Sequence, residues 1–211
     1  DLLGLVDRAL VYGKALTEER AGVPLVEVRC YLGGVIAESE AMKMVCELAK
    51  RVAPTPTSIL IRGEKGVGKA LIARTIHDLT RRKDLPFLSI DCSAHPEGEV
   101  VRKLFAGGPA EGGPMFLRAE GGTILLERVE SMGATLQRLL LAVLTNKSVG
   151  RLRDGVPEEI PVDVRVLAST DMDLKDLVDT GLFLDKLYDR LRLIPVTIPP
   201  LRERKEDILA L

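Results

Sequence analysis

Short apolar runs alternate with helix-type segments along most of this chain, and this alternation limits the folds that it can adopt. The apolar runs lie at residues 58–63, 86–93, 121–127, 162–170 and 191–201. Helix-type segments lie between them, at residues 69–82, 98–105, 131–146 and 173–181. Strands that alternate with helices form a parallel sheet, and largely continuous apolar runs indicate burial on both faces. The sequence therefore predicts an α/β three-layer fold with a mostly parallel sheet and helices on both faces.

A glycine-rich segment, "GEKGVGK", spans Gly63 to Lys69 and joins the first of these runs to the helix-type segment after it. That is the context of a phosphate-binding loop, in which glycines let backbone N–H groups turn toward phosphates at a helix N-terminus. The lysine would reach the β- and γ-phosphates of a nucleotide. The sequence thus predicts a P-loop NTPase fold with ATP or ADP as ligand; a glycine turn that only links strand to helix is the alternative. The predicted binding residues are Gly63, Glu64, Lys65, Gly66, Val67, Gly68, Lys69 and Ala70.

Two positions depart from a complete nucleotide-hydrolysing site. The Ser or Thr that usually follows the loop lysine and touches magnesium is Ala70. The apolar run of "GGTILLERVESM" ends in Glu127-Arg128, where two carboxylates would commonly hold magnesium and orient a water. Arg128 is either a cation for the γ-phosphate or a surface residue paired with Glu127 or Glu130, and the surface pairing is the preferred interpretation.

Composition restricts the environment and the partners. The chain is 46% hydrophobic and 29% charged, as expected of a soluble globular protein, and its net charge of −1 favours neither nucleic acid nor an anionic membrane. No apolar run approaches the roughly 20 residues that span a bilayer, and the start shows no signal-peptide pattern. Cys30, Cys46 and Cys92 fit no metal spacing and are expected to be free thiols. We therefore expect a cytoplasmic protein without membrane contact.

Beyond these local features, a series of blocks in order resembles the AAA+ domain of bacterial sigma-54-dependent transcriptional activators. The blocks include "GVIAESEAMKMVCELAKRVAPTPTSILIRGEKGVGKALIARTIHDLT", "FLSIDCSAHPEG", "AEGGTILLERVESM", "PVDVRVLASTDMDL" and "LYDRLRLIPVTIPPLRERKEDI". The resemblance implies a nucleotide-binding AAA+ domain over residues 34–211, with its helical lid absent or truncated. Residues 1–33 are then a linker helix and connector, whose first 20 residues resemble the end of a receiver domain.

The resemblance also implies a ring-forming ATPase that uses ATP and Mg²⁺ to remodel sigma-54 polymerase. In the family an Asp-Glu pair ends the Walker B strand, and here those positions are Glu127 and Arg128. Glu127 would hold Mg²⁺ through water, whereas Arg128 cannot accept a proton. The family's sensor asparagine is Asp171, and of two arginines that reach a neighbour's site one is Leu184 and the other is kept as Arg190. The candidate catalytic residues are therefore Glu127, Asp171 and Arg190.

The family's GAFTGA loop, which contacts sigma-54, should lie between Phe105 and Gly121. The segment "AGGPAEGGPMFLRAE" at 106–120 contains no such motif and is too short for the loop. We therefore expect no remodelling of sigma-54 polymerase by this chain.

Three functions remain open at this point. The preferred one is a nucleotide-binding regulatory module of a transcription regulator, impaired in hydrolysis. The second is a working ATPase ring in which Glu127 or Asp171 serves as the catalytic carboxylate, and the third is a nucleotide-free oligomerisation module. Expected partners are further copies of the chain, in a dimer or ring, and RNA polymerase or other transcription factors. A stripe of Leu3, Val6 and Leu10 predicts weak dimers, and DNA would be bound only through a domain outside this chain.

Overall fold

The computed structural model describes residues 30–107, 112–153 and 156–211, so the predicted helix at 1–20 and its dimer stripe lie outside the described residues. A five-stranded sheet with the order β4-β5-β8-β3-β9 forms the centre, and all its pairings are parallel. The strands are β3 Ile59–Arg62, β4 Phe87–Asp91, β5 Thr123–Glu127, β8 Arg165–Thr170 and β9 Ile194–Thr197. The predicted parallel α/β sheet is confirmed.

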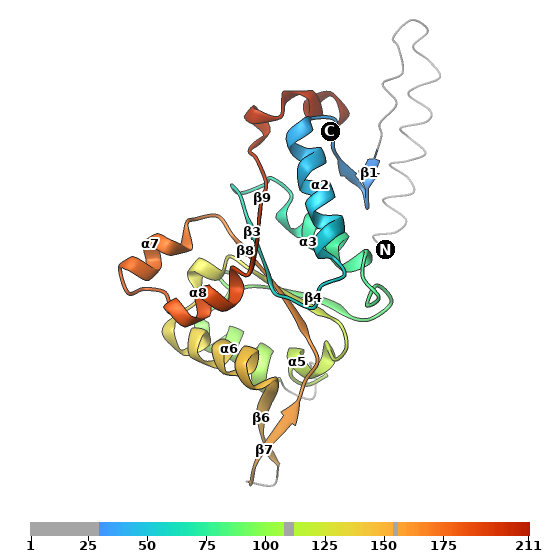
Figure 1. Cartoon of the computed structure of the whole chain (residues 1–211). Helices are drawn as coiled ribbons and strands as arrows, with labels where there is room; N and C mark the ends of the chain where they lie inside the picture. The colour runs from blue at the N-terminus through green and yellow to red at the C-terminus, as the bar shows by residue number, and fades with distance from the viewer. Residues whose placement is uncertain (1–29, 108–111, 154–155) are drawn as a thin grey trace, which may run out of the picture.

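Helices cover both faces of this sheet (Figure 1). Their bounds are α2 Glu40–Val52, α3 Lys69–Asp78, α4 Glu97–Val101, α5 Met115–Arg118, α6 Ala134–Asn146, α7 Leu174–Asp179 and α8 Asp185–Leu191. One core cluster joins Ile124 and Leu126 of β5 to α4, α6 and α8, while the other joins Leu125 to α2 and α3. Consecutive residues of β5 therefore enter opposite cores, which is the two-sided burial that its continuous apolar run predicts.

Asp207, near residue 211, forms hydrogen bonds that stabilise the start of α2. Ser39 is the N-cap, and its side chain accepts a hydrogen bond from the backbone N–H of Met42 at 3.3 Å. The fully buried carboxylate of Asp207 accepts bonds from the N–H groups of Glu38 and Ser39, both at 2.7 Å, and from the Ser39 hydroxyl at 2.9 Å. Segments 168 residues apart are thereby joined. Asp207 lies in a 3₁₀ segment, Lys205–Ala210.

Two predicted helices end differently in the structure. The helix predicted for 69–82 stops at Asp78, because the Thr80 hydroxyl donates to the His77 carbonyl at 2.7 Å and accepts from the Arg82 N–H at 2.9 Å. Such local side-chain bonds compete with helical ones. The helix predicted for 98–105 begins at Glu97 and widens after Val101 into a π-helical turn, Arg102–Ala106.

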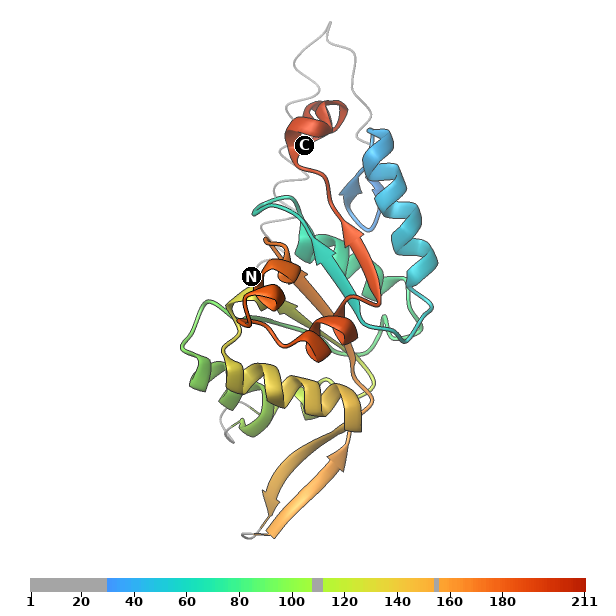
Figure 2. The same cartoon turned by 60° about the vertical axis from the view of Figure 1, so that its left-hand side comes forward.

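An antiparallel hairpin extends from the body of the domain (Figures 1 and 2). It consists of β6 Ser148–Arg153 and β7 Val156–Pro161, with Ser148 opposite Pro161. A second small antiparallel pair, β1 Cys30–Leu32 and β2 Val35–Ile36, precedes α2. Among the described residues, no helix is both long and apolar enough to cross a membrane.

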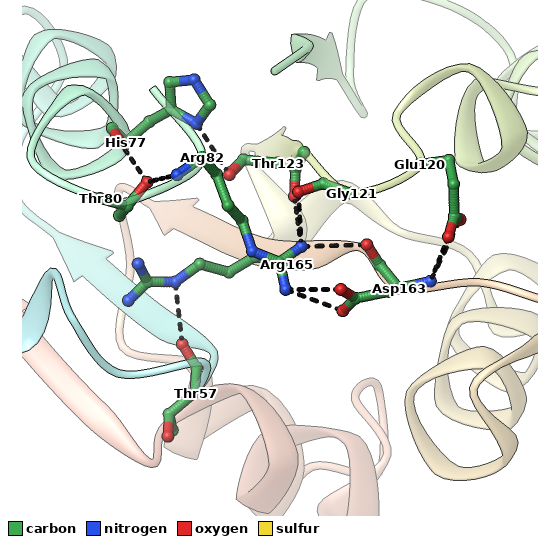
Figure 3. A network of polar contacts seen from close by, with 10 residues as sticks. Thr57, His77, Thr80, Arg82, Glu120, Gly121, Thr123, Asp163 and Arg165 are labelled. Atoms are coloured by element: carbon green, nitrogen blue, oxygen red, sulfur yellow. Dashed lines mark hydrogen bonds and ion pairs between the residues drawn. The ribbon is translucent and has the colours of Figure 1, made fainter. Parts of the chain in front are cut away.

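Polar contacts stabilise the edge of the sheet where β5 and β8 begin (Figure 3). The buried guanidinium of Arg165 donates to the carbonyls of Ala53 at 2.7 Å and Val52 at 3.0 Å, at the end of α2. Burial, with a smaller contribution from the charge of Arg82, lowers the pKa of Arg165 to about 10. Arg82 itself forms two bonds to the Asp163 carboxylate, at 2.8 and 2.9 Å. These contacts stabilise the fold at the edge where the strands begin. The opposite edge, where the strands end, is available for a binding site.

Candidate functional site

The candidate site lies where the parallel strands end, the edge at which open α/β sheets bind ligands. The glycine-rich loop follows β3, Asp91 ends β4, Glu127 ends β5, and Asp171 follows β8. Asp91 and Glu127 are opposite each other in the register of their two strands. Four segments that are far apart in the sequence therefore meet at one place.

The loop has the backbone that its glycines were expected to provide. Gly66 and Gly68 have φ values of 85° and 99°, in the left-handed region that disfavours other residues. Gly68 is the N-cap of α3, whose first residue is Lys69. The Lys69 side chain is buried, donates to the carbonyls of Gly63 and Glu64 at 2.8 Å each, and forms an ion pair with Asp171. The three donors of the ammonium are thus all used within the chain.

Two cavities flank the loop and share Lys65, Gly66 and Gly68. The first, the phosphate pocket, is a cavity of about 380 Å³ lined by Lys65, Gly66, Gly68, Lys69, Ala70, Asp91, Glu127, Arg128, Ser169 and Asp171. The second, the base pocket, is a cavity of about 450 Å³ lined by Gly34, Val35, Ile36, Met42, Glu64, Lys65, Gly66, Val67, Gly68, Leu71, Ile72, Pro200, Leu201, Arg202, Arg204 and Leu211. Charged side chains predominate in the lining of the first, and aliphatic side chains are the largest group in the lining of the second, which suits the phosphates and the base of one nucleotide.

Two arginines that line the base pocket, Arg202 and Arg204, form polar contacts with the glycine-rich loop. Arg202 forms a two-pronged ion pair with the Glu64 carboxylate, at 2.7 and 2.8 Å, and this hydrogen bonding lowers the pKa of Glu64. The buried Arg204 donates to the Val67 carbonyl at 3.0 Å. Neither arginine was predicted as a site residue, because sequence distance hides the contact of residues 202–204 with the loop.

Arg128 stands in the phosphate pocket and pairs with Asp91. It follows β5 with φ 52° and ψ 53°, an uncommon conformation for a residue other than glycine. Its Nε donates to Asp91 Oδ1 at 2.9 Å, and its Nη2 forms an ion pair with Oδ2. The expected partners, Glu127 and Glu130, are wrong, because β4 lies beside β5 and brings its terminal carboxylate to Arg128. The side chain is 34% exposed and therefore accessible from the pocket.

The predicted residues are only partly brought together. The loop from Gly63 to Ala70, Glu127 and Asp171 converge around the phosphate pocket, and the Asp171 N–H also donates to Glu130 at 3.2 Å. Arg190 is exposed on α8 and lines neither cavity, so a role for it would require a second copy of the chain.

The residues present do not by themselves make a magnesium site. The Asp91 carboxylate is engaged by Arg128 and by the Ser93 N–H and hydroxyl, at 2.9 and 3.1 Å. Asp171 is engaged by Lys69, and Ala70 supplies no hydroxyl. Within the described ranges there is no group of three His, Cys, Asp or Glu side chains that could hold a metal. Glu127 alone remains for a water-mediated contact.

The fold and its loop define an α/β P-loop NTPase domain. Residues 35–197 match the family described as the Sigma-54 interaction domain, and the chain belongs to that family. The regulatory protein AtoC of Escherichia coli (strain K12) is 36% identical over 211 residues, which is 97% of this chain and 45% of AtoC. The C4-dicarboxylate transport transcriptional regulatory protein DctD of Pseudomonas aeruginosa is 38% identical over 215 residues, 98% of this chain and 46% of DctD.

Solved structures show the same fold. NtrX from Brucella abortus in complex with ADP superposes with a TM-score of 0.77 at 30% identity, over 99% of this chain and 44% of NtrX. The same protein in complex with ATP gives the same values. The P-loop NTPase domain of a sigma-54 transport activator from E. coli, at 18% identity and a TM-score of 0.55, supports the fold alone. The chain spans about half the length of the curated regulators AtoC and DctD.

Proposed function

We propose that this domain binds ATP or ADP as the regulatory module of a bacterial transcription regulator and is impaired in hydrolysis. The observation that carries the proposal is the combination of a complete glycine loop around Lys69 with Arg128, locked on Asp91, where a water-orienting carboxylate would be needed. Binding requires the loop amides and the lysine, and both are present. Hydrolysis requires a group that positions or deprotonates water, and an arginine cannot do so.

NtrX from Brucella abortus, at 30% identity, has been solved in complex with ADP and with ATP, and this supports the choice of ligand. The size and lining of the two cavities support it independently. Glu127 favours a second candidate function, a slow but working ATPase. Its carboxylate has no hydrogen-bond or ion-pair partner among the described residues, and it lines the phosphate pocket.

We further propose that the domain does not remodel sigma-54 polymerase. An added Cβ on Gly107 would lie 2.2 Å from the carbonyl carbon of Gly113, so the two ends of this connection lie against each other. The five residues 108–112 between these ends allow a protrusion of at most about 11 Å. Too little chain is available for a reaching loop. Contact with another transcription factor, self-association in a dimer or ring, and DNA binding through a domain outside this chain remain parts of the proposal.

Two measurements test the nucleotide function. Titration with a fluorescent ATP analogue should show saturable binding that Lys69→Ala abolishes, while Lys186→Ala, an exposed lysine on α8, should bind normally. Phosphate release by the same preparations should not exceed that of Lys69→Ala. Absence of binding to the unaltered chain would favour a nucleotide-free module, and sustained phosphate release would favour the ATPase.

A further inference from the structure

We propose that the guanidinium of Arg128 takes the place of magnesium in the phosphate pocket, so that the domain binds a nucleoside triphosphate without divalent metal and in preference to the diphosphate. This inference rests on the proposed nucleotide function and specifies its ligand. Two residues near the place where magnesium would bind are unsuited to holding it. Ala70 has no hydroxyl, and Asp91 is already neutralised by Arg128.

The charges of the pocket make a resident cation necessary. Its lining contains the carboxylates of Asp91, Glu127 and Asp171 and the cations Lys65, Lys69 and Arg128, three of each sign. A triphosphate that enters this balanced pocket without metal needs a cation that can exchange its present partner for phosphate. A guanidinium provides it in a planar fork that matches phosphate oxygens in two parallel hydrogen bonds.

Arg128 can change partner at little cost. If it leaves Asp91 for a phosphate, it exchanges one anion for another. The Asp91 carboxylate keeps two donors, the N–H of Ser93 at 2.9 Å and the Ser93 hydroxyl at 3.1 Å. Asp91 then lacks a counter-ion, but its side chain is 29% exposed and can be hydrated, so the penalty is smaller than for breaking a fully buried pair. The ion pair with Asp91 thus positions Arg128 beside the pocket and can break when a phosphate binds.

The position of Arg128 explains the preference for triphosphate. The loop amides and Lys69 form one wall of the pocket and take the phosphates nearest the helix N-terminus. Arg128 lies on the wall formed by the strand ends, beside Asp91 and Glu127. That wall faces the outermost phosphate, which the diphosphate lacks. Arg128 therefore adds, to whatever contact Lys69 makes, a charge that only the triphosphate engages.

The test is calorimetric titration of the full chain with ATP and with ADP, each in EDTA and in Mg²⁺. We expect ATP to bind equally in both buffers and more tightly than ADP. Arg128→Gln should weaken ATP binding in EDTA by roughly 10- to 100-fold, the range expected for charge-assisted hydrogen bonds. It should change ADP binding far less, and Arg128→Lys should restore part of the loss.

Arg192→Gln is a matched control, because Arg192 Nε donates to Asp189 Oδ1 at the same 2.9 Å on α8 and lines neither cavity. It should leave both affinities unchanged. Binding that requires Mg²⁺ would overturn the inference and leave the proposed function intact. An equal loss of ATP and ADP binding in Arg128→Gln, with a lower Tm, would show a structural clamp and also overturn it. Absence of binding under every condition would reject the proposed function together with the inference.

Discussion

The ammonium of Lys69 is held by the carboxylate of Asp171, the residue that follows β8. Two backbone carbonyls, of Gly63 and Glu64, take its remaining donors at 2.8 Å. The lysine that a nucleotide needs is therefore fully satisfied before any nucleotide binds. A ligand must share or replace these bonds, so the ion pair sets part of the cost of binding.

Asp171→Asn should strengthen nucleotide binding. The change removes the negative charge that competes with phosphate for Lys69, and keeps the size of the side chain. We expect the dissociation constant for ATP to fall roughly fivefold, which corresponds to about 1 kcal/mol. The measurement is titration of the two proteins side by side, with Asp179→Asn, an exposed residue at the end of α7, as the control. Weaker binding in Asp171→Asn would mean that Asp171 contributes to holding the nucleotide.

Hydrolysis should stay at the level of the Lys69→Ala blank, and Arg128→Glu alone should restore little. Proton transfer by a positioned base is worth about 10²–10⁴ in rate. A glutamate at 128 could supply the base, but Ala70 and Asp171 would still leave the site without its metal hydroxyl and its sensor amide. Phosphate release over several turnovers measures this. Turnover by the unaltered chain clearly above the blank would identify Glu127 or Asp171 as a substitute carboxylate.

The sequence predicted the parts of this site that are local, and missed those that depend on strand order. The glycine loop between β3 and α3 is one continuous segment, so its pattern was sufficient. The partner of Arg128 was not predictable in the same way, because Asp91 is 37 residues away and reaches it only since β4 lies beside β5. The same holds for Arg202, which is 138 residues from Glu64.

Helix ends were missed for a different reason. The apolar period reaches Leu79 and residues 80–82 contain no Gly or Pro, but Thr80 bonds to the backbone of His77 and Arg82 and ends α3 at Asp78. The sequence does not show where a threonine will end a helix, because its hydroxyl can either stay in solvent or compete with the helical hydrogen bonds. The prediction of β5 succeeded because its one threonine, Thr123, bonds to the His77 ring rather than to neighbouring backbone.

Sigma-54 should not co-elute with this domain in the presence of ATP, ADP or a transition-state analogue. The ends of the connection between Gly107 and Gly113 lie against each other, so its length allows a protrusion of only about 11 Å. Size-exclusion chromatography of the purified domain with sigma-54 provides the measurement, and a regulator that carries the GAFTGA loop serves as the positive control. A stable complex that depends on nucleotide would contradict the expectation and direct attention to the β6-β7 hairpin as the contact.

Asp207→Ala should destabilise the domain by about 3 kcal/mol. The carboxylate is fully buried and accepts bonds from two backbone N–H groups, of Glu38 and Ser39, and from the Ser39 hydroxyl. Its removal leaves these donors buried without a partner, and each such group costs about 1–3 kcal/mol. Urea unfolding gives the free energy. Glu203→Ala, an exposed residue of the same C-terminal segment, should change it by less than about 0.5 kcal/mol.

Acid should destabilise the fold through His77. The imidazole is buried, its Nδ1 lies 2.9 Å from the Thr123 hydroxyl, and its Nε2 has no partner among the described residues. Burial lowers the pKa of His77 below its ordinary value of 6.5, so the folded chain binds this proton less readily than the unfolded chain. The unfolded state therefore gains protons first as the pH falls below 6.5, and the free energy of unfolding decreases from that point until the folded histidine is also protonated.

The comparison that isolates His77 is urea unfolding at pH 7.5 and at about pH 5 for the unaltered chain and His77→Gln, which cannot titrate. Carboxylates contribute to the acid dependence of both proteins and cancel in the difference. We expect His77→Gln to be less stable at neutral pH, since the fit to Thr123 and Phe87 is disturbed, but to lose less stability on acidification. His95→Gln, at an exposed histidine, should retain the full dependence. Identical pH slopes for His77→Gln and the unaltered chain would show that His77 is protonated in the folded state as easily as in the unfolded one.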